Sequence, residues 1–417
     1  MTMVTEIPCY IEETGVTQLE RYCEERSIHR FWLVADENTY AALGRAVETA
    51  LAARGWAVKS IVLEGPEVIA DEHAITQVLL QIDGEPRHFL AVGSGTVTDI
   101  TRFVSHRTRS PFIAMPTAPS VDGYTSTGAP LVIGRYKWTF QAHPPLAVFA
   151  DLPTLCAAPR LMIAAGFGDM LGKFTALADW RLDHLLWDGP YDAAVAQRTR
   201  AALQHCVDHA AEIGQASAAG IRALMEGLIE SGLCMTTAGH SRPASGAEHL
   251  LAHYWEMLLL REGRPAILHG AKVGVGAVLI AGYYAQLRKF TPAEALARLQ
   301  ATPWPDPEAE MERLRMEYGE LARAIIDEQR RFLALTASSR DRLIEKIVGH
   351  WPEIQAIAAT VPAPDTLRAW LAQVGGPADP ADLGLSDDEG GAALAFAHYL
   401  RDRFTVYKLS RMLGMAD

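Results

Sequence analysis

Residues 88–105, HFLAVGSGTVTDITRFVS, carry the pattern that decides the fold. The apolar run 88–92 predicts a buried strand, the glycines of 93–96 predict a turn, and 96–105 has helical spacing. The flanking segments repeat this alternation, with strands expected at 31–35, 58–63, 111–115 and 147–151 and helices at 39–53 and 71–82. Strands that alternate closely with helices are typical of a parallel sheet with helices packed on it. We therefore predict an α/β N-terminal domain of the nucleotide-binding type.

The pattern changes in two steps. Residues 117–146 form a polar, irregular stretch with a hairpin expected around Gly134, and beyond about residue 160 strand signals almost vanish. Ala, Leu, Met, Glu and Arg recur at helical spacing to the C-terminus. Loops are expected at 187–192, 236–247, 302–307, 361–365 and 375–389. The sequence thus predicts two domains, an α/β domain over 1–157 and an all-α domain over 158–417.

The composition is that of a globular protein, with 49% hydrophobic and 21% charged residues in a chain of 417. The formal net charge of −12 argues against a nucleic-acid partner. Five scattered cysteines without a CxxC pair indicate reduced thiols and a cytoplasmic location. We expect no signal peptide, because residues 1–13 lack a basic region followed by an apolar run. We expect no membrane span, because the longest apolar run, 273–284, is short and broken by glycines.

The turn at 93–96 is a candidate pyrophosphate site. Its glycines allow close backbone approach, and the first amides of the following helix point at whatever lies above them. The Rossmann fingerprint is incomplete, since Thr98 stands where a third glycine is required, and an ordinary strand-to-helix turn is the alternative. Asp36, at the end of the first expected strand, could bind a ribose diol or cap the next helix.

The segment 117–126, TAPSVDGYTS, leaves the carboxyl end of a strand, where ligands bind in such sheets. The hydroxyls of Thr117, Ser120 and Ser126 could hold a carboxamide and a ribose, and Asp122 could hold a substrate hydroxyl. A polar turn shaped by proline and glycine is the alternative.

Three histidines and one aspartate form a candidate metal site. His249 and His253 are four residues apart, so on a helix they share a face, and His269 follows in the next element. Asp169 could complete a site for a divalent metal such as zinc. The alternatives are hydrogen-bonded structural histidines and a surface pair between Asp169 and Lys173.

Taken together, these residues resemble the sn-glycerol-1-phosphate dehydrogenase family, within the dehydroquinate synthase-like and iron-containing alcohol dehydrogenase superfamily. The bacterial branch is more similar than the archaeal one. The matching stretches span nearly the whole chain: GSGTVTDI at 93–100, PTAPSVDGYTSTGAP at 116–130, GFGDMLGKFTALADWRL at 166–182, SRPASGAEHLLAHYWE at 241–256, LHGAKVGVG at 268–276 and RDRFTVYKL at 401–409.

The resemblance implies a homodimeric, metal-dependent enzyme that interconverts dihydroxyacetone phosphate and sn-glycerol 1-phosphate with NAD(H) or NADP(H). It implies zinc or nickel bound by Asp169, His249 and His269, and substrate at Asp122, Asp169 and His253, which are also the expected catalytic residues. The cofactor residues expected from it are Gly93, Ser94, Gly95, Thr96, Val97, Thr117, Ala118, Pro119, Ser120 and Ser126, to which the ribose argument adds Asp36. Whether the product serves phospholipid metabolism is left open.

Three alternatives remain: a dehydrogenase of another polyol or polyol phosphate, a dehydroquinate synthase-type lyase, and a non-catalytic metal-binding protein. The lyase is disfavoured because it is expected to have glutamate in place of Asp169. Asp36 would favour NAD, since a carboxylate repels a 2′-phosphate. The residues that bind the substrate phosphate are not assigned, and the candidates are Lys137, Lys173, Arg242 and Lys272.

Overall fold

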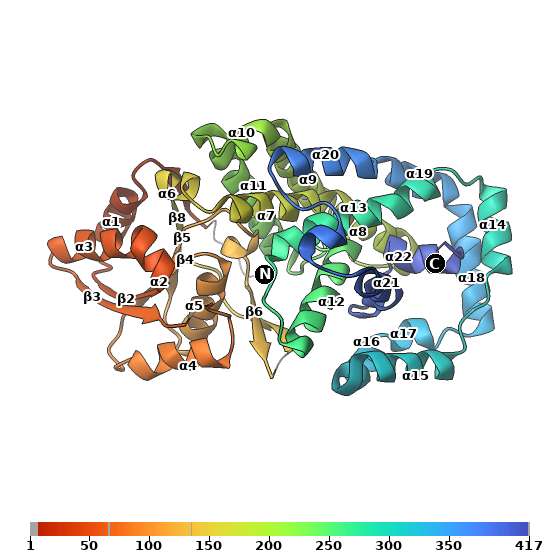
Figure 1. The fold of residues 1–417 in the computed structure, drawn as a ribbon, viewed down its shortest axis with the longest axis horizontal. Helices are drawn as coiled ribbons and strands as arrows, with labels where there is room; N and C mark the ends of the chain where they lie inside the picture. The colour runs from red at the N-terminus through yellow and green to blue at the C-terminus, as the bar shows by residue number, and fades with distance from the viewer. Residues whose placement is uncertain (1–6, 66, 135, 416–417) are drawn as a thin grey trace. The chain divides into compact units, whose positions relative to one another are not determined.

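The computed structural model of the chain describes residues 7–65, 67–134 and 136–415 (Figure 1). Residues 1–6 of the N-terminal stretch used to argue against a signal peptide lie outside the described residues. The chain folds into two compact units, the first comprising Met1–Met170, Ala201–His240 and Gln373–Gly375, and the second Leu171–Arg200, Ser241–Ala372 and Gly376–Asp417. The first unit extends past residue 157 because helix α11 (Ala218–Ala238) packs against β1 and α6. A domain boundary at 157/158 stays a prediction.

A six-stranded parallel sheet organises the first unit. Its strand order is β1-β8-β5-β4-β2-β3, and each neighbouring pair runs parallel. The strands are β1 Cys9–Glu12, β2 Arg30–Asp36, β3 Ala57–Leu63, β4 His88–Gly93, β5 Phe112–Pro116 and β8 Val148–Asp151. The five predicted strands are therefore confirmed to within about a residue. The edge strand β1 was not predicted.

Helices cover both faces of this sheet. Figure 1 shows α1 (Gly15–Glu25) and α3 (Arg45–Ala53) on one side, and α4 (Glu72–Gln81) and α5 (Gly95–Arg107) on the other. Alternate residues of β2 face the α1 and α3 side and join a buried cluster with Leu19, Val47 and Leu51 from these helices. Because both faces are buried, the strand sequences are nearly continuous apolar runs.

The irregular stretch after β5 contains the expected hairpin. Strands β6 (Gly128–Ile133) and β7 (Tyr136–Gln141) pair antiparallel, and Gly134 has a φ of 59° in the connection. Glycine adopts this left-handed conformation without the steric penalty of a side chain. The prediction of a hairpin around Gly134 is confirmed.

From Leu152 onward the described chain is helical, as predicted. The helices are α6 Leu152–Cys156, α7 Arg160–Leu171, α8 Lys173–Trp187, α9 Ala193–Asp208, α10 Ala210–Gly214, α11 Ala218–Ala238, α12 Ala247–Glu262, α13 His269–Leu287, α14 Pro292–Ala301, α15 Pro307–Tyr318, η3 Gly319–Leu321, α16 Ala322–Glu328, α17 Arg330–Leu333, α18 Ala337–Gly349, α19 Trp351–Ala359, α20 Pro364–Gln373, η4 Pro380–Leu383, α21 Asp387–Phe396, η5 Ala397–Tyr399 and α22 Val406–Met412. The expected loop 375–389 is interrupted by η4 and by the first turn of α21, where Ser386 accepts the backbone N–H of Glu389 in a capping box.

The span Arg160–Trp187, formed by α7 and α8, is long and apolar enough to cross a membrane by length and composition. This span, rather than 273–284, is the strongest such candidate among the described residues. In the fold, however, 89% of its most apolar window is buried, as is usual for a core helix.

Gly166 in α7 passes the backbone of the loop after β5 at close range. A Cβ atom built at this position would overlap the carbonyl oxygen of Pro119. We expect Gly166→Ala to lower the free energy of unfolding by about 1–3 kcal/mol, because backbone rather than a flexible side chain must move. Gly391→Ala in α21 is the matched control: nothing lies within 4 Å of its added Cβ, and alanine is the better helix former there. Urea titration of both variants measures the difference, and equal stabilities would contradict the expected clash.

Candidate functional site

The turn after β4 has the geometry of an anion site. Ser94, in an extended conformation, precedes α5, and the first backbone N–H groups of a helix have no partner within it. A Cβ on Gly93 would lie 2.5 Å from Val97, and one on Gly95 would lie 2.8 Å from Val121, so both positions require glycine. The strand-turn-helix context is therefore as expected. Cofactor binding by Gly93–Val97 stays a prediction.

The segment 117–126 is an ordered loop. Thr117 donates its backbone N–H to the Gly93 carbonyl at 3.2 Å, which places the two candidate cofactor segments side by side. Tyr124 donates its hydroxyl to the Ala118 carbonyl at 2.5 Å, and Ser120 and Ser126 are buried. The loop is thus held in place at the carboxyl ends of the strands, where such sheets bind ligands.

Arg102, which sequence reasoning did not single out, anchors this loop. Its guanidinium is fully buried and donates to the carbonyls of Gly123 (2.6 Å), Tyr124 (3.1 Å) and Gly128 (2.9 Å). It also pairs with Asp99 at 2.6 Å. Burial raises the pKa of Asp99 to about 7, against the positive charge of Arg102. The sequence shows an arginine on the apolar face of α5, and this could have marked Arg102 as buried. The carbonyl groups that it contacts could not be predicted from the sequence.

Asp36 caps helix α2 (Glu37–Thr39), which is one of the two roles predicted for it. Its carboxylate accepts the backbone N–H of Thr39 at 2.8 Å, and the Thr39 hydroxyl accepts the N–H of Asp36 at 3.0 Å. Asp36 lies at the carboxyl end of β2, so a role at a ribose remains compatible with the cap. That role stays a prediction.

Asp122 is a buried residue held by polar contacts of its backbone and its carboxylate. Its backbone N–H donates to Oδ2 of Asp169 at 3.1 Å, and its own Oδ2 accepts the hydroxyl of Ser231 at 2.8 Å. Ser231 lies 109 residues along the chain on α11, so the sequence offered no sign of this partner. The hydrogen bond fixes the orientation of the Asp122 carboxylate.

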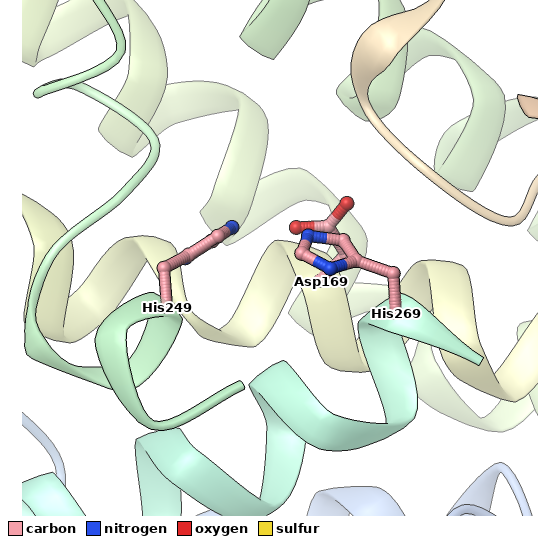
Figure 2. Close-up of side chains that lie close together, drawn as sticks. All are labelled: Asp169, His249 and His269. Carbon is pink, nitrogen blue, oxygen red and sulfur yellow. The ribbon is translucent and has the colours of Figure 1, made fainter. Parts of the chain in front are cut away.

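Asp169, His249 and His269 lie together. Each offers one ligand atom, and these atoms all lie within 4.8 Å of one another. Figure 2 shows the three side chains turned toward a common space, from the last turn of α7, the first turn of α12 and the first residue of α13. One carboxylate and two imidazoles are a donor set suited to zinc or another divalent transition metal. The predicted ligand set is brought together by the fold.

His253 lies beside this cluster and is not a member of it. Its ring centroid is 6.2 Å from that of His249 and 5.8 Å from that of His269. Its Nδ1 lies 3.8 Å from the carboxylate of Glu256, which also lies 3.6 Å from Nζ of Lys272. The predicted division between two ligand histidines and one substrate histidine stays a prediction.

Glu248 orients His249 and was missed by sequence reasoning. Its Oε1 lies 2.8 Å from Nδ1 of His249, which leaves Nε2 for a metal. Oε1 also accepts the N–H of Gly246 at 2.6 Å, while Oε2 accepts the hydroxyl of Thr175 at 2.6 Å. Burial alone would raise the pKa of Glu248, but these contacts hold it below its usual value. A carboxylate behind a ligand histidine is a recurring metal-site arrangement.

We expect Glu248→Gln to weaken zinc affinity about 10–100-fold, since the amide orients His249 less well and no longer strengthens its basicity. Competition with a chromophoric chelator measures the affinity. Glu256→Gln, on the same helix α12, is the matched control and should leave zinc affinity unchanged. A Glu248→Gln protein that binds zinc as tightly as the wild type would disprove the orienting role.

Asp179 fixes the start of α12 through hydrogen bonds to its carboxylate. Its carboxylate accepts the backbone N–H groups of Ala247 and Val406, both at 2.7 Å, and the hydroxyl of Tyr284 at 2.7 Å. Burial and the neighbouring charge of Glu248 raise its pKa to about 7, against these hydrogen bonds. The stretches 241–256 and 401–409, far apart in sequence, are thereby tied to one carboxylate.

The four candidate phosphate residues have different surroundings. Lys272 is buried and lies beside Glu256, and Nε of Arg242 donates to Asp183 at 3.1 Å. Lys173 is fully buried at the start of α8, and Lys137 is half-buried on β7. No single one is selected by these contacts.

Comparisons with known proteins agree with this geometry. A family model described as iron-containing alcohol dehydrogenase matches residues 10–159. The chain is 42% identical to a glycerol-1-phosphate dehydrogenase [NAD(P)+] from Geobacillus stearothermophilus, over 95% of this chain and 90% of the relative. It is 38% identical to the protein of that name from Bacillus subtilis, over 96% and 91% of the two chains. Among solved structures, glycerol dehydrogenase from Schizosaccharomyces pombe shares the fold, with a TM-score of 0.60, 15% identity and coverage of 100% and 90%.

Proposed function

The chain belongs to the glycerol-1-phosphate dehydrogenase family, and we propose that it interconverts dihydroxyacetone phosphate and sn-glycerol 1-phosphate with NAD(H) or NADP(H). The observation that carries this proposal is the cluster of Asp169, His249 and His269 in a chain about 40% identical to such enzymes over nearly its whole length. The fold and the oxidoreductase class of the relatives agree with it.

Asp169, His249 and His269 would hold one divalent ion, zinc or nickel. The hydrogen bond from His249 Nδ1 to Glu248 supports this assignment, because it directs the other ring nitrogen to the cluster. When bound, such an ion supplies a Lewis acid to the C2 oxygen of the substrate.

The residues of the chain orient the substrate and handle its proton. Asp122, held by Ser231, accepts a hydrogen bond from a substrate hydroxyl. The Glu256 carboxylate near Nδ1 of His253 favours a proton on that nitrogen, so Nε2 faces the C2 oxygen and exchanges its proton. Asp169 serves both the ion and the positioning of the Asp122 loop.

The nicotinamide cofactor, which supplies the hydride, would lie along the carboxyl ends of β4 and β5. The backbone amides of Gly95, Thr96 and Val97 would hold its pyrophosphate. The loop 117–126 would hold the nicotinamide half. Asp36 would accept hydrogen bonds from the adenosine ribose and favour NAD over NADP.

One assay tests the proposal: purified protein with zinc or nickel, NADH or NADPH, and dihydroxyacetone phosphate. We expect the absorbance at 340 nm to fall and chiral analysis to identify sn-glycerol 1-phosphate. Turnover of dihydroxyacetone or another unphosphorylated ketone alone would overturn it. Light scattering of the same sample tests the proposed homodimer.

A further inference from the structure

A cavity of about 500 Å³ lies within the helical unit. It is lined by residues of α14, the α14–α15 connection, α17, α18, η5 and the end of α22, among them the arginines 298, 340 and 411 and the aromatic side chains of Trp304, Phe332 and Tyr399. No aspartate or glutamate lines it. A volume of this size suits a ligand of nucleotide dimensions.

The cavity is distant from the metal cluster. His269 is the first residue of α13, which has 19 residues and is therefore about 28 Å long. The cavity lies at the other end of this helix: the guanidinium of Arg298 is 4.6 Å from the ring of Phe290, three residues after α13 ends. Figure 1 shows α14 and α18 together at one end of the helical unit, near the C-terminal end of the chain. The cavity therefore cannot be a subsite for a three-carbon substrate at the metal cluster.

The three arginines form no close ion pair at the cavity, although the charge of Arg298 does help lower the pKa of Glu294 four residues earlier on α14. Arg298 donates to the Leu413 carbonyl at 3.4 Å, Arg340 to the Thr302 carbonyl at 2.9 Å and Arg411 to the Ala395 carbonyl at 3.3 Å. Within the described ranges, none of the three has a carboxylate within 4.0 Å. Each guanidinium has five N–H donors, so most of them remain for a ligand.

This absence of carboxylates is unusual in a chain with a net charge of −12. A neighbouring cavity shows the ordinary arrangement, where Lys346 pairs with Asp188 at 2.8 Å and Arg330 with Asp327 at 2.7 Å. The positive charge of Arg411 also adds to burial in holding the pKa of the nearby His398 well below its usual range. Three guanidinium groups with no lining carboxylate make the cavity favourable for an anion.

The aromatic side chains that line the cavity indicate which chemical group is attached to the bound anion. Trp304 is partly exposed, Arg340 lies over its ring at 5.2 Å, and the ring of Phe332 packs against it at 5.3 Å. A flat, polarisable base can stack on such a surface while phosphates engage the guanidinium groups. We propose that this cavity is a second, non-catalytic site that binds a nucleoside triphosphate, with its phosphates on Arg298, Arg340 and Arg411 and its base against Trp304.

Calorimetric titration of ATP into the full-length protein saturated with NADH tests the site, because NADH then occupies the catalytic cofactor site. We expect one equivalent of ATP to bind per chain, and Arg340→Gln to weaken it by about tenfold or more, since a charge-assisted phosphate contact contributes roughly 1.5–3 kcal/mol. Arg298→Gln, at an exposed position, should do the same if Arg340→Gln disturbs folding. Both variants should reduce dihydroxyacetone phosphate at the wild-type rate.

Arg342→Gln is the matched control, since Arg342 is exposed on the same helix and donates to the hydroxyls of Ser338 and Ser339 outside the cavity. It should bind ATP like the wild type. The proposal is overturned by absent ATP binding in the wild type, by equal binding in the arginine variants, or by inorganic tripolyphosphate binding as tightly as ATP. If ATP fails to bind and Arg340→Gln alters the oligomeric state, the cavity holds an acidic segment of a second copy instead.

Discussion

Protein carrying His249→Ala is expected to purify without stoichiometric metal and to lose at least about 10³-fold in kcat/KM, because loss of the Lewis acid removes several kcal/mol of transition-state stabilisation. His249 offers one of the three ligand atoms that lie within 4.8 Å of one another, so its removal leaves only Asp169 and His269. Mass spectrometry of the metal content and NADH oxidation with dihydroxyacetone phosphate measure the two effects.

His253→Ala is the control for this result. Its ring lies 6.2 Å from that of His249, and it is placed on the substrate rather than on the ion. We expect the variant to keep its metal and to lose about 10²–10⁴-fold in kcat, the usual contribution of a general acid or base. The ligand assignment is wrong if His249→Ala retains both metal and rate, and the division of roles is wrong if His253→Ala loses the metal.

Arg102→Met is expected to lower the free energy of unfolding by about 3–5 kcal/mol, the range for breaking a buried charged network by removing one partner. Three carbonyls, those of Gly123, Tyr124 and Gly128, lose their donor, and the buried Asp99 carboxylate loses its counter-charge. Because these carbonyls belong to the loop region proposed to hold the nicotinamide half, the KM for NADH should rise as well.

Arg107→Met on the same helix is the matched control. Arg107 is exposed, and its guanidinium lies 5.0 Å from the ring of Phe103. An exposed cation–π contact contributes about 0.5–1 kcal/mol. Chemical denaturation compares the two variants, and a loss in Arg102→Met no larger than in Arg107→Met would show that the loop does not depend on the buried guanidinium.

The parallel sheet was predictable because burial on both faces makes each central strand a continuous apolar run. Residues 31–35 and 111–115 show this plainly. Strand β1 escaped prediction because it has four residues at the sheet edge and only Ile11 among them is buried. A run that short and mixed has no periodicity to detect.

The grouping of Asp169, His249 and His269 was predictable because a histidine on one helix, a histidine at the start of the next and a carboxylate make a metal-type donor set. The glycines of 93–96 predicted the strand-turn-helix geometry, and cofactor binding there stays a prediction. The partners that hold them were not predictable, because carboxylates such as Glu248 and Asp179 look like any helical surface residue until burial is known. The contacts of Asp179 join residues 68 to 227 positions apart, which no local pattern encodes.

The hydrogen bond from the Asp122 backbone to the Asp169 carboxylate has a thermodynamic consequence. One carboxylate serves both the proposed metal cluster and the loop proposed to receive the nicotinamide, so the occupancy of either changes the free energy of the other. Such coupling is reciprocal. The factor by which metal loading tightens NADH binding must therefore equal the factor by which NADH tightens metal binding, and the two titrations close a single cycle.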